Sequence, residues 1–199
     1  MRLGILGGTF DPIHFGHLAA ADAAMECAQL DRVMFIPSSQ PPHRGDTVAP
    51  ANQRLEMTKR AVEGRENFEA SDIEVRRGGA SYTSDTLAEL KRSKPDADLW
   101  LILGWDAARL FGSWHQPSKV KQLASFVVVS RPGTPPPHAD ELIAAGLDPE
   151  NVVLCLRRTP DISASDLRQA IANGEPISES VPEPVARYIA EHHLYMDNR

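Results

Sequence analysis

The sequence predicts an α/β fold in which a doubly wound parallel sheet carries helices on both faces. Segments with strand patterns alternate with segments with helix patterns along the chain. Most of the strand segments are apolar throughout, whereas a half-exposed strand would alternate. Continuously apolar strands fit a sheet that is buried on both sides. No linker, repeat or low-complexity stretch interrupts the pattern, so we expect a single domain over residues 1–199, with a helical C-terminal part from about 160 to 199.

Short apolar or alternating runs, several of them ending in Gly or Pro, mark the expected strands. RLGILGG and DLWLILG are apolar runs that end in glycine, and FEASDIEVRRG alternates. The expected strands cover residues 2–8, 31–37, 68–78, 98–104, 125–133 and 151–156. Residues 38–50 hold a proline-rich polar stretch that is too long for a plain connection, so it is a candidate binding loop.

Capping residues, apolar periodicity and terminal glycines mark the expected helices. Asn52 and Gly64 bound one such segment, and Ser163 and Gly174 bound another. The expected helices cover residues 16–29, 52–64, 83–93, 163–174 and 182–195, and a further helix follows the proline turn within 134–146.

Composition excludes several classes of protein. The 199 residues carry a net charge of −6, which does not indicate a surface for long nucleic acid. No apolar stretch approaches the roughly 20 residues of a membrane span, and the N-terminus lacks a signal-peptide pattern. We therefore expect a cytoplasmic protein with no membrane partner. Cys27 and Cys155 sit in no metal or redox spacing, and we expect both to be buried, unpaired thiols in a reducing compartment.

The stretch GGTFDPIHFGHL, residues 7–18, carries the strongest functional signal. Glycines at the end of a strand let a ligand approach the backbone, and the N-terminus of the following helix attracts anions. His14 and His17 would stand at the start of that helix, where each imidazole can donate to a phosphate oxygen. The sequence lacks the other residues that would define a zinc site, a protease dyad, a P-loop or a dinucleotide-binding loop.

A second constellation, ISASDLR, covers residues 162–168. Ser163 is expected to be a helix N-cap, with Ser165 and Asp166 in the first turn and Arg168 one turn further. Taken alone, these residues could be caps and nothing more. Beside the first motif they favour a second phosphate contact, because a triphosphate has more oxygens than one helix end can satisfy.

Together the two motifs resemble the nucleotidyltransferases that carry an H-x-G-H signature, which have a Rossmann-like fold. More narrowly, the chain resembles the bacterial nicotinate-nucleotide adenylyltransferases over almost its whole length. PPHR (41–44), SYTSDTL (81–87), LILGWD (101–106) and VVVSRPG (127–133) fall where that family has similar segments. The chain departs from the family's usual pattern at Ala164 in the second motif and at Arg44, Trp105 and His115.

The resemblance implies a role for each matching residue. His14, His17 and Arg168 would be catalytic. The ATP-binding residues would be Gly8, Thr9, Phe10, Gly104, Asp106 and Ser165, with Asp106 accepting from a ribose hydroxyl. The mononucleotide would be bound by Arg44, Thr83, Trp114, His115 and Arg131, with Trp114 stacking on the pyridine ring.

Several of these residues also have ordinary structural explanations. Asp106 and Thr83 could be helix caps, Trp114 could belong to the core, and Arg44 and Arg131 could be solvated surface charges.

The implied activity transfers the adenylyl group of ATP to nicotinate mononucleotide and releases pyrophosphate, with Mg²⁺ bound to the ATP and no metal held by the protein. The alternatives are a related adenylyl- or cytidylyltransferase with another acceptor, such as nicotinamide mononucleotide or phosphopantetheine, and a non-catalytic nucleotide sensor. A homo-oligomer is compatible with the sequence.

Overall fold

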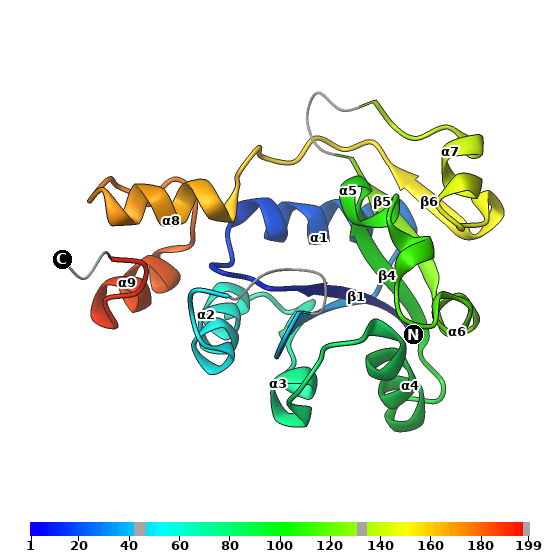
Figure 1. Cartoon of the computed structure of the whole chain (residues 1–199), viewed down its shortest axis with the longest axis horizontal. Helices are drawn as coiled ribbons and strands as arrows, with labels where there is room; N and C mark the ends of the chain where they lie inside the picture. The colour runs from blue at the N-terminus through cyan, green and yellow to red at the C-terminus, as the bar shows by residue number, and fades with distance from the viewer. Residues whose placement is uncertain (42–46, 131–134, 197–199) are drawn as a thin grey trace. The chain divides into compact units, whose positions relative to one another are not determined.

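Six strands form one sheet in the order β3-β2-β1-β4-β5-β6. The computed structural model describes residues 1–41, 47–130 and 135–196 (Figure 1). The strands are β1 (Arg2–Gly8), β2 (Arg32–Pro37), β3 (Phe68–Ala70), β4 (Asp98–Gly104), β5 (Ser125–Val129) and β6 (Val152–Cys155). The pairs β1–β4, β4–β5 and β5–β6 are parallel. This confirms the predicted Rossmann-like parallel sheet, in which ligands bind beyond the carboxyl ends of the strands where the strand order reverses.

The helices within the described residues connect the strands in chain order. They are α1 (Phe15–Ala28), α2 (Ala51–Val62), α3 (Ile73–Arg77), α4 (Thr83–Ser93), α5 (Trp105–Ala108), α6 (Pro117–Leu123), α7 (Ala139–Ala144), α8 (Ala164–Ala172) and α9 (Glu183–Glu191), with short 3₁₀ turns at Phe111–Ser113 and Pro149–Asn151. None of these helices has the length and apolar character needed to cross a membrane.

The chain divides into two compact units, and β1, β2 and α1 contribute residues to both. The first unit comprises Met1–Leu6, Ala19–Met34 and Tyr82–Pro160. Its strands β4 and β5 are buried over their apolar middles, at Leu99 and Leu101–Leu103 in β4 and at Phe126–Val129 in β5, as the continuous apolar runs predict. In this unit α1 covers one face of the sheet and α4 the other (Figure 1). Helices on both faces were predicted and are confirmed.

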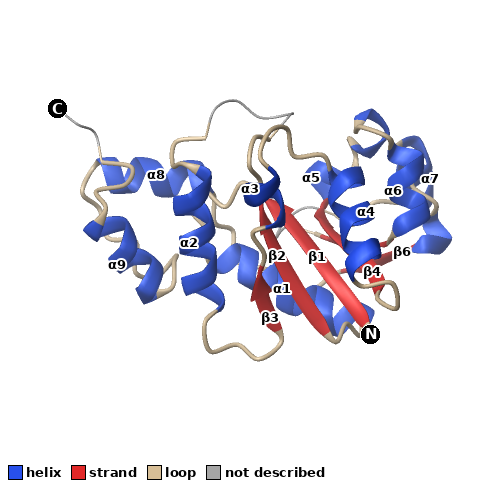
Figure 2. Cartoon of the chain, turned by 90° about the horizontal axis from the view of Figure 1, so that it is seen from below, coloured by secondary structure: helices blue, strands red, loops and turns tan. Residues whose placement is uncertain are grey.

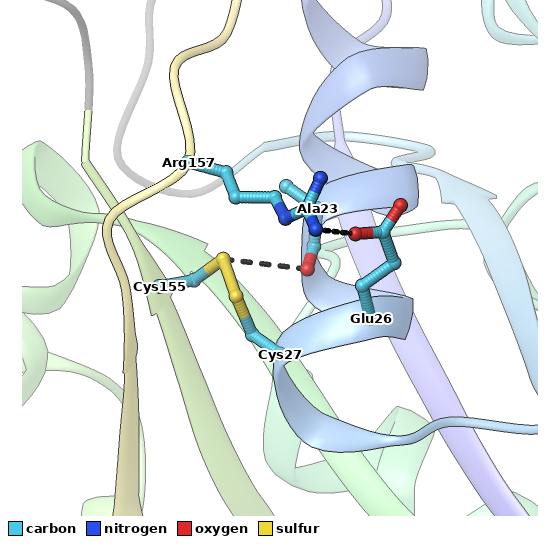
Figure 3. The surroundings of a disulfide bond; sticks show 5 residues. All are labelled: Ala23, Glu26, Cys27, Cys155 and Arg157. Carbon is cyan, nitrogen blue, oxygen red and sulfur yellow. Dashed lines mark hydrogen bonds and ion pairs between the residues drawn. A yellow bond between two sulfur atoms is a disulfide. The ribbon is translucent and has the colours of Figure 1, made fainter.

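A disulfide bond joins Cys27, in the last turn of α1, to Cys155, at the end of β6 (Figure 3). Glu26 and Arg157 form an ion pair beside it, and Cys155 Sγ lies 3.3 Å from the carbonyl oxygen of Ala23. The prediction of two unpaired thiols is therefore wrong. The two cysteines are 128 residues apart in sequence, and the fold brings the end of α1 close to the end of β6.

The second unit comprises Gly7–Leu18, Phe35–Ser81 and Asp161–Arg199. Its helix α2 packs against β3 and α9, and α2, α8 and α9 lie close together in Figure 2. The Arg60 guanidinium lies 4.8 Å from the centre of the Tyr188 ring, which fastens α2 to α9. The rings of Phe35 and Phe68 meet at 5.2 Å between β2 and β3. This unit contains both predicted phosphate-binding motifs.

The predicted strand over residues 68–78 is wrong beyond Ala70. The chain instead forms α3, whose start is supported by Ser71 Oγ accepting from the backbone N–H of Ile73. The helix ends at Gly78, which has a φ of +70° and so takes the left-handed conformation that glycine favours. The alternating pattern was interpreted as a strand, although Ser71 and Gly78 are typical of the start and the end of a helix.

Other boundaries also differ from the prediction. The last helix stops at Glu191 rather than at residue 195, because His193 and Tyr195 have φ values of 50° and 62° that a helix cannot contain. The helix predicted after the proline turn within 134–146 is confirmed as Ala139–Ala144. The short helices α5 and α6, between β4 and β5, were not predicted; the second begins with Pro117, a residue suited to the first helical turn.

Candidate active site

The turn that follows β1 holds its residues in an unusual conformation. Phe10 has a φ of +49°, which is rare for a bulky side chain and persists only where packing holds it. Its buried ring lies 6.0 Å from Phe35 and meets the ring of His17 edge-on at 5.0 Å. A Cβ added to Gly8 would lie 3.1 Å from the Phe10 ring, so glycine lets this ring pack over the strand end.

His14 and His17 lie together at the N-terminus of α1, as predicted. The carbonyl oxygen of His14 accepts from the backbone N–H of His17 at 3.0 Å, which begins the helix. The two imidazoles stack with centroids 3.7 Å apart. The backbone N–H of His14 donates to Nδ1 of His17 at 3.3 Å, so that nitrogen carries no proton and the neutral ring holds its proton on Nε2. His17 can therefore donate from Nε2 to an anion.

Arg54, on α2, holds the turn in place, although sequence analysis did not select it. Its side chain is fully buried, and its guanidinium donates only to backbone carbonyl oxygens. These belong to Thr9 at 2.5 Å, Ser38 at 2.7 Å, Ala49 at 3.0 Å and Ser39 at 3.2 Å. One side chain thus joins the turn after β1 to the loop after β2.

Asp11 is a second unpredicted organiser of the turn. Its buried carboxylate accepts from the backbone N–H groups of Val48, at 2.8 Å, and Ala49, at 3.1 Å, and from the hydroxyl of Tyr195, at 2.7 Å. Its backbone carbonyl oxygen accepts from a guanidinium nitrogen of Arg168 at 2.8 Å. The first motif and the predicted phosphate-binding arginine are therefore in direct contact.

Burial and charge shift the pKa values of the groups around Asp11. Burial lowers the pKa of the Arg54 guanidinium, against the nearby charges of Asp11 and Glu74, which raise it. Burial also raises the pKa of the Tyr195 hydroxyl far above its ordinary value, and the negative charge of Asp11 adds to that shift. Tyr195 is thus a neutral donor to Asp11 at any ordinary pH.

The second motif forms α8, as predicted. Ser163 is its N-cap, and the Ser163 hydroxyl accepts from the backbone N–H of Asp166 at 3.5 Å. The hydroxyls of Ser163 and Ser165 lie 2.7 Å apart, and Ser165 is exposed. Arg168 lies one turn further and reaches Asp11. The cap and the arginine are therefore in place, while Ala164 presents no polar side chain.

The residues predicted to bind adenosine lie in the first unit, at the end of β4. Gly104 is exposed, and a Cβ added there would meet nothing within 4 Å. Asp106 lies in the first turn of α5 and forms an exposed ion pair with Arg109 at 3.7 Å. The alternative role of Asp106 as an N-cap is wrong, because Gly104 occupies the N-cap position of that helix.

The residues predicted to bind the pyridine end also lie in the first unit. Thr83 is the first residue of α4, after Tyr82 at the N-cap, so its alternative role as the cap is wrong. His115 is exposed, and its ring stacks on that of Tyr82 with centroids 4.2 Å apart. Trp114 is half-buried, with its ring 5.6 Å from that of Phe111. The other two predicted contacts, Arg44 and Arg131, lie outside the described residues.

Comparison with known proteins identifies the chain as a nucleotidyltransferase. A sequence model of the cytidylyltransferase-like family matches residues 5–170, which includes both motifs. A protein of Dehalococcoides mccartyi, named "Probable nicotinate-nucleotide adenylyltransferase", is 42% identical over 199 residues, with 98% of this chain and 97% of the relative covered. A protein of the same name from Hydrogenovibrio crunogenus is 42% identical over 202 residues, with 97% of each chain covered.

The chain belongs to the nicotinate-nucleotide adenylyltransferase family. The fold is shared by the nicotinic acid mononucleotide adenylyltransferase of Plasmodium falciparum solved in complex with NaAD, with a TM-score of 0.77 at 18% identity over 98% of this chain and 97% of that one. The family resemblance predicted from the motifs is confirmed.

Sequence analysis missed Arg54, Asp11 and Tyr195 for different reasons. Arg54 falls on the same face of α2 as Thr58 and Ala61, which are buried. This helical spacing is a signal that could have identified Arg54 as a buried residue. Asp11 stands inside the first motif but was given no role. Tyr195 carries no local signal, because its partner is 184 residues away.

Proposed function

We propose that the chain transfers the adenylyl group of ATP to nicotinate mononucleotide, which gives nicotinate adenine dinucleotide and pyrophosphate. The observation that carries the proposal is the grouping of His14, His17 and Arg168 around the turn after β1 in a chain of this family. Two imidazoles, a helix N-terminus and a guanidinium all favour bound phosphate oxygens. This is the donor set that a triphosphate requires.

The reaction needs no covalent intermediate and no general base. The attacking group is the 5′-phosphate of the mononucleotide, whose second pKa of about 6 leaves it largely ionised at neutral pH. An oxygen of that phosphate forms a bond to the α-phosphorus of ATP while the bond to the pyrophosphate oxygen breaks in line. The enzyme contributes positioning and neutralisation of the charge that develops.

His17 and Arg168 take the main part in that neutralisation. His17 offers its Nε2 proton, because Nδ1 already accepts from the backbone. Arg168 uses one guanidinium nitrogen for Asp11, and a guanidinium has five N–H donors in all, so it can bind phosphate as well. His14, Gly8, Thr9, Phe10 and Ser165 complete the phosphate-binding set.

Mg²⁺ enters as the complex of ATP. Arg168 and the imidazoles are cationic or neutral donors, so they fit the phosphate oxygens and leave the ion to be held by the nucleotide. Within the described ranges 1–41, 47–130 and 135–196, no group of three or more His, Cys, Asp or Glu residues could hold a metal ion. When bound, Mg²⁺ neutralises charge on the departing pyrophosphate.

The proposed nucleoside contacts follow the residues that match the family. Asp106 accepts from a ribose hydroxyl of adenosine beside the open backbone at Gly104. Thr83 and the backbone near His115 receive the nicotinate carboxylate, and Trp114 stacks on the pyridine ring. Arg44 and Arg131 pair with the mononucleotide phosphate or its ribose. The helix start at α4 supports the carboxylate assignment, because N–H groups at a helix N-terminus attract anions.

An acceptor panel tests the proposed function. The purified protein is incubated with MgATP and, separately, with nicotinate mononucleotide, nicotinamide mononucleotide and phosphopantetheine, and pyrophosphate and dinucleotide are quantified. We expect the nicotinate compound to be the preferred acceptor. Turnover with phosphopantetheine alone would assign another member of the superfamily, and ATP binding without turnover of any acceptor would assign a nucleotide sensor.

A further inference from the structure

Asp11 connects the C-terminal end of the chain to the predicted triphosphate-binding arginine through two different groups of one residue. Its side-chain Oδ1 accepts from the Tyr195 hydroxyl at 2.7 Å, and its backbone carbonyl oxygen accepts from Arg168 at 2.8 Å. All three residues belong to the second unit. A rotation of the Asp11 backbone would therefore break the contact with Arg168, while the contacts of the carboxylate oppose that rotation.

Among the described residues, three donors hold the carboxylate of Asp11, and one of them is a side chain. The N–H groups of Val48 and Ala49 lie directly before α2, and Tyr195 lies beyond α9. Arg54 holds the same region through the carbonyl oxygens of Thr9 and Ala49. Tyr195 is therefore the one side chain that bonds the Asp11 carboxylate among the hydrogen bonds of the described residues.

We infer that Tyr195 is a positioning residue for Arg168 and acts through Asp11; this inference rests on the proposed function. The hydroxyl donates to a buried carboxylate, and a hydrogen bond to a charged group in such surroundings is among the stronger kinds. Its loss loosens the Asp11 turn, and the guanidinium of Arg168 then samples orientations that no longer match the triphosphate. The consequence is a higher KM for ATP, with no direct effect on the KM for the mononucleotide.

Tyr195→Phe isolates this effect, because it keeps the buried ring and removes only the hydroxyl. We expect the KM for ATP to rise on the order of tenfold, which is the range for one hydrogen bond to a buried charge, with the KM for nicotinate mononucleotide unchanged. Tyr188→Phe is the matched control: it removes a tyrosine hydroxyl in the same unit and keeps the ring that packs under Arg60. We expect it to match the unsubstituted protein in both KM values.

A double-mutant cycle separates positioning from a general structural role. The effect of Tyr195→Phe on the KM for ATP is measured in the natural chain and again in an Arg168→Ala background. If Tyr195 acts through Arg168, the effect disappears in the second background. An equal effect in both backgrounds, or an unchanged KM for ATP in an active Tyr195→Phe protein, overturns the inference.

Two further outcomes are distinguishable from these. If Tyr195→Phe yields no folded protein, Asp11→Asn replaces it in the same cycle. This variant keeps the backbone carbonyl that Arg168 contacts and loses the charged acceptor of the Tyr195 hydroxyl. Its effect on the KM for ATP should likewise disappear in the Arg168→Ala background. If the unsubstituted protein shows no adenylyl transfer to any acceptor, the proposed function falls, and the inference falls with it. An active natural chain with an unaffected variant overturns the inference alone.

Discussion

The backbone N–H of His14 donates to Nδ1 of His17 across 3.3 Å, and this bond fixes which nitrogen of His17 can meet a phosphate. A donor placed on Nδ1 selects the neutral ring with its proton on Nε2. The stacked ring of His14 and the edge of Phe10 hold that ring in its orientation. In the proposed reaction, His17 would be prepared as a donor before any substrate binds, an arrangement that lowers the cost of stabilising a transition state.

His17→Ala should lower kcat by about 100- to 1,000-fold, because it removes one donor aimed at the transferring phosphate. The affinity for ATP should fall much less, since other donors remain at the helix start. Steady-state kinetics and ATP titration check this together. His192→Ala is the matched control, because that histidine is exposed, contacts the Tyr188 ring and belongs to neither motif. Near-normal turnover in a folded His17→Ala protein would remove His17 from the catalytic set.

Arg168→Lys should raise the KM for ATP, lower kcat, or do both, although it keeps the charge. A lysine offers one ammonium group and cannot hold the Asp11 carbonyl and bridge two phosphate oxygens as a guanidinium can. Arg187→Lys, an exposed substitution in α9 at an ion pair with Glu183, controls for the loss of a guanidinium as such. The test compares the KM for ATP and the kcat of both variants with those of the unsubstituted protein. If Arg168→Lys changes neither value, Arg168 has a structural role only.

The sheet and the two motifs were predictable because their signals are local. Apolar runs and terminal glycines mark β1 and β4, and Ser163 was recognised as a cap from its position before an amphipathic segment. The strand predicted over 68–78 failed because alternation over so short a stretch is also compatible with the single-turn helix that Gly78 ends. Local patterns of that length do not decide between strand and helix.

The contacts that organise the site were not predictable because they join distant parts of the chain. Tyr195 and Asp11 are 184 residues apart, and Cys27 and Cys155 are 128 apart. No spacing rule predicts a pair at such separation. Arg54 was missed because arginine is ordinarily exposed, and only the tertiary structure shows the four carbonyl oxygens that it satisfies.

The Cys27–Cys155 disulfide should stabilise the fold measurably. In the chain-entropy description, a crosslink that closes a loop of this length stabilises by about 4–5 kcal/mol, which corresponds to a thermal midpoint about 10–15 °C higher. We expect a reducing agent to lower the midpoint by that order. Cys27→Ala should already melt at the lower temperature and should not respond to the reductant.

Thiol titration in denaturant gives the independent readout for the disulfide. The protein purified without reductant should show no reactive thiol, and the reduced protein should show both. Two reactive thiols before reduction, together with a midpoint that the reductant leaves unchanged, would contradict the crosslink.

Alkaline pH should weaken the fold through Tyr195. Burial raises the pKa of its hydroxyl in the folded state, so above the ordinary pKa of about 10 the unfolded chain loses a proton that the folded chain keeps. The stabilisation is complete below pH 10 and falls by about 1.4 kcal/mol for each pH unit above it. Urea unfolding at pH 8, 10 and 11 should show the advantage of the natural chain over Tyr195→Phe shrinking above pH 10. A constant difference would contradict the raised pKa.

Discrimination between two acceptors tests the proposed function most directly. Nicotinate and nicotinamide mononucleotides differ by a carboxylate against an amide. The N–H donors that we propose near Thr83 and His115 would favour the carboxylate at both oxygens. The NH₂ group of the amide would point a donor toward a donor. Each buried group left without a partner costs about 1–3 kcal/mol, so one mismatch gives roughly tenfold discrimination. The measurement is kcat/KM for each mononucleotide at saturating MgATP. We predict at least a tenfold preference for nicotinate mononucleotide, and equal values or a preference for the amide would contradict the assignment.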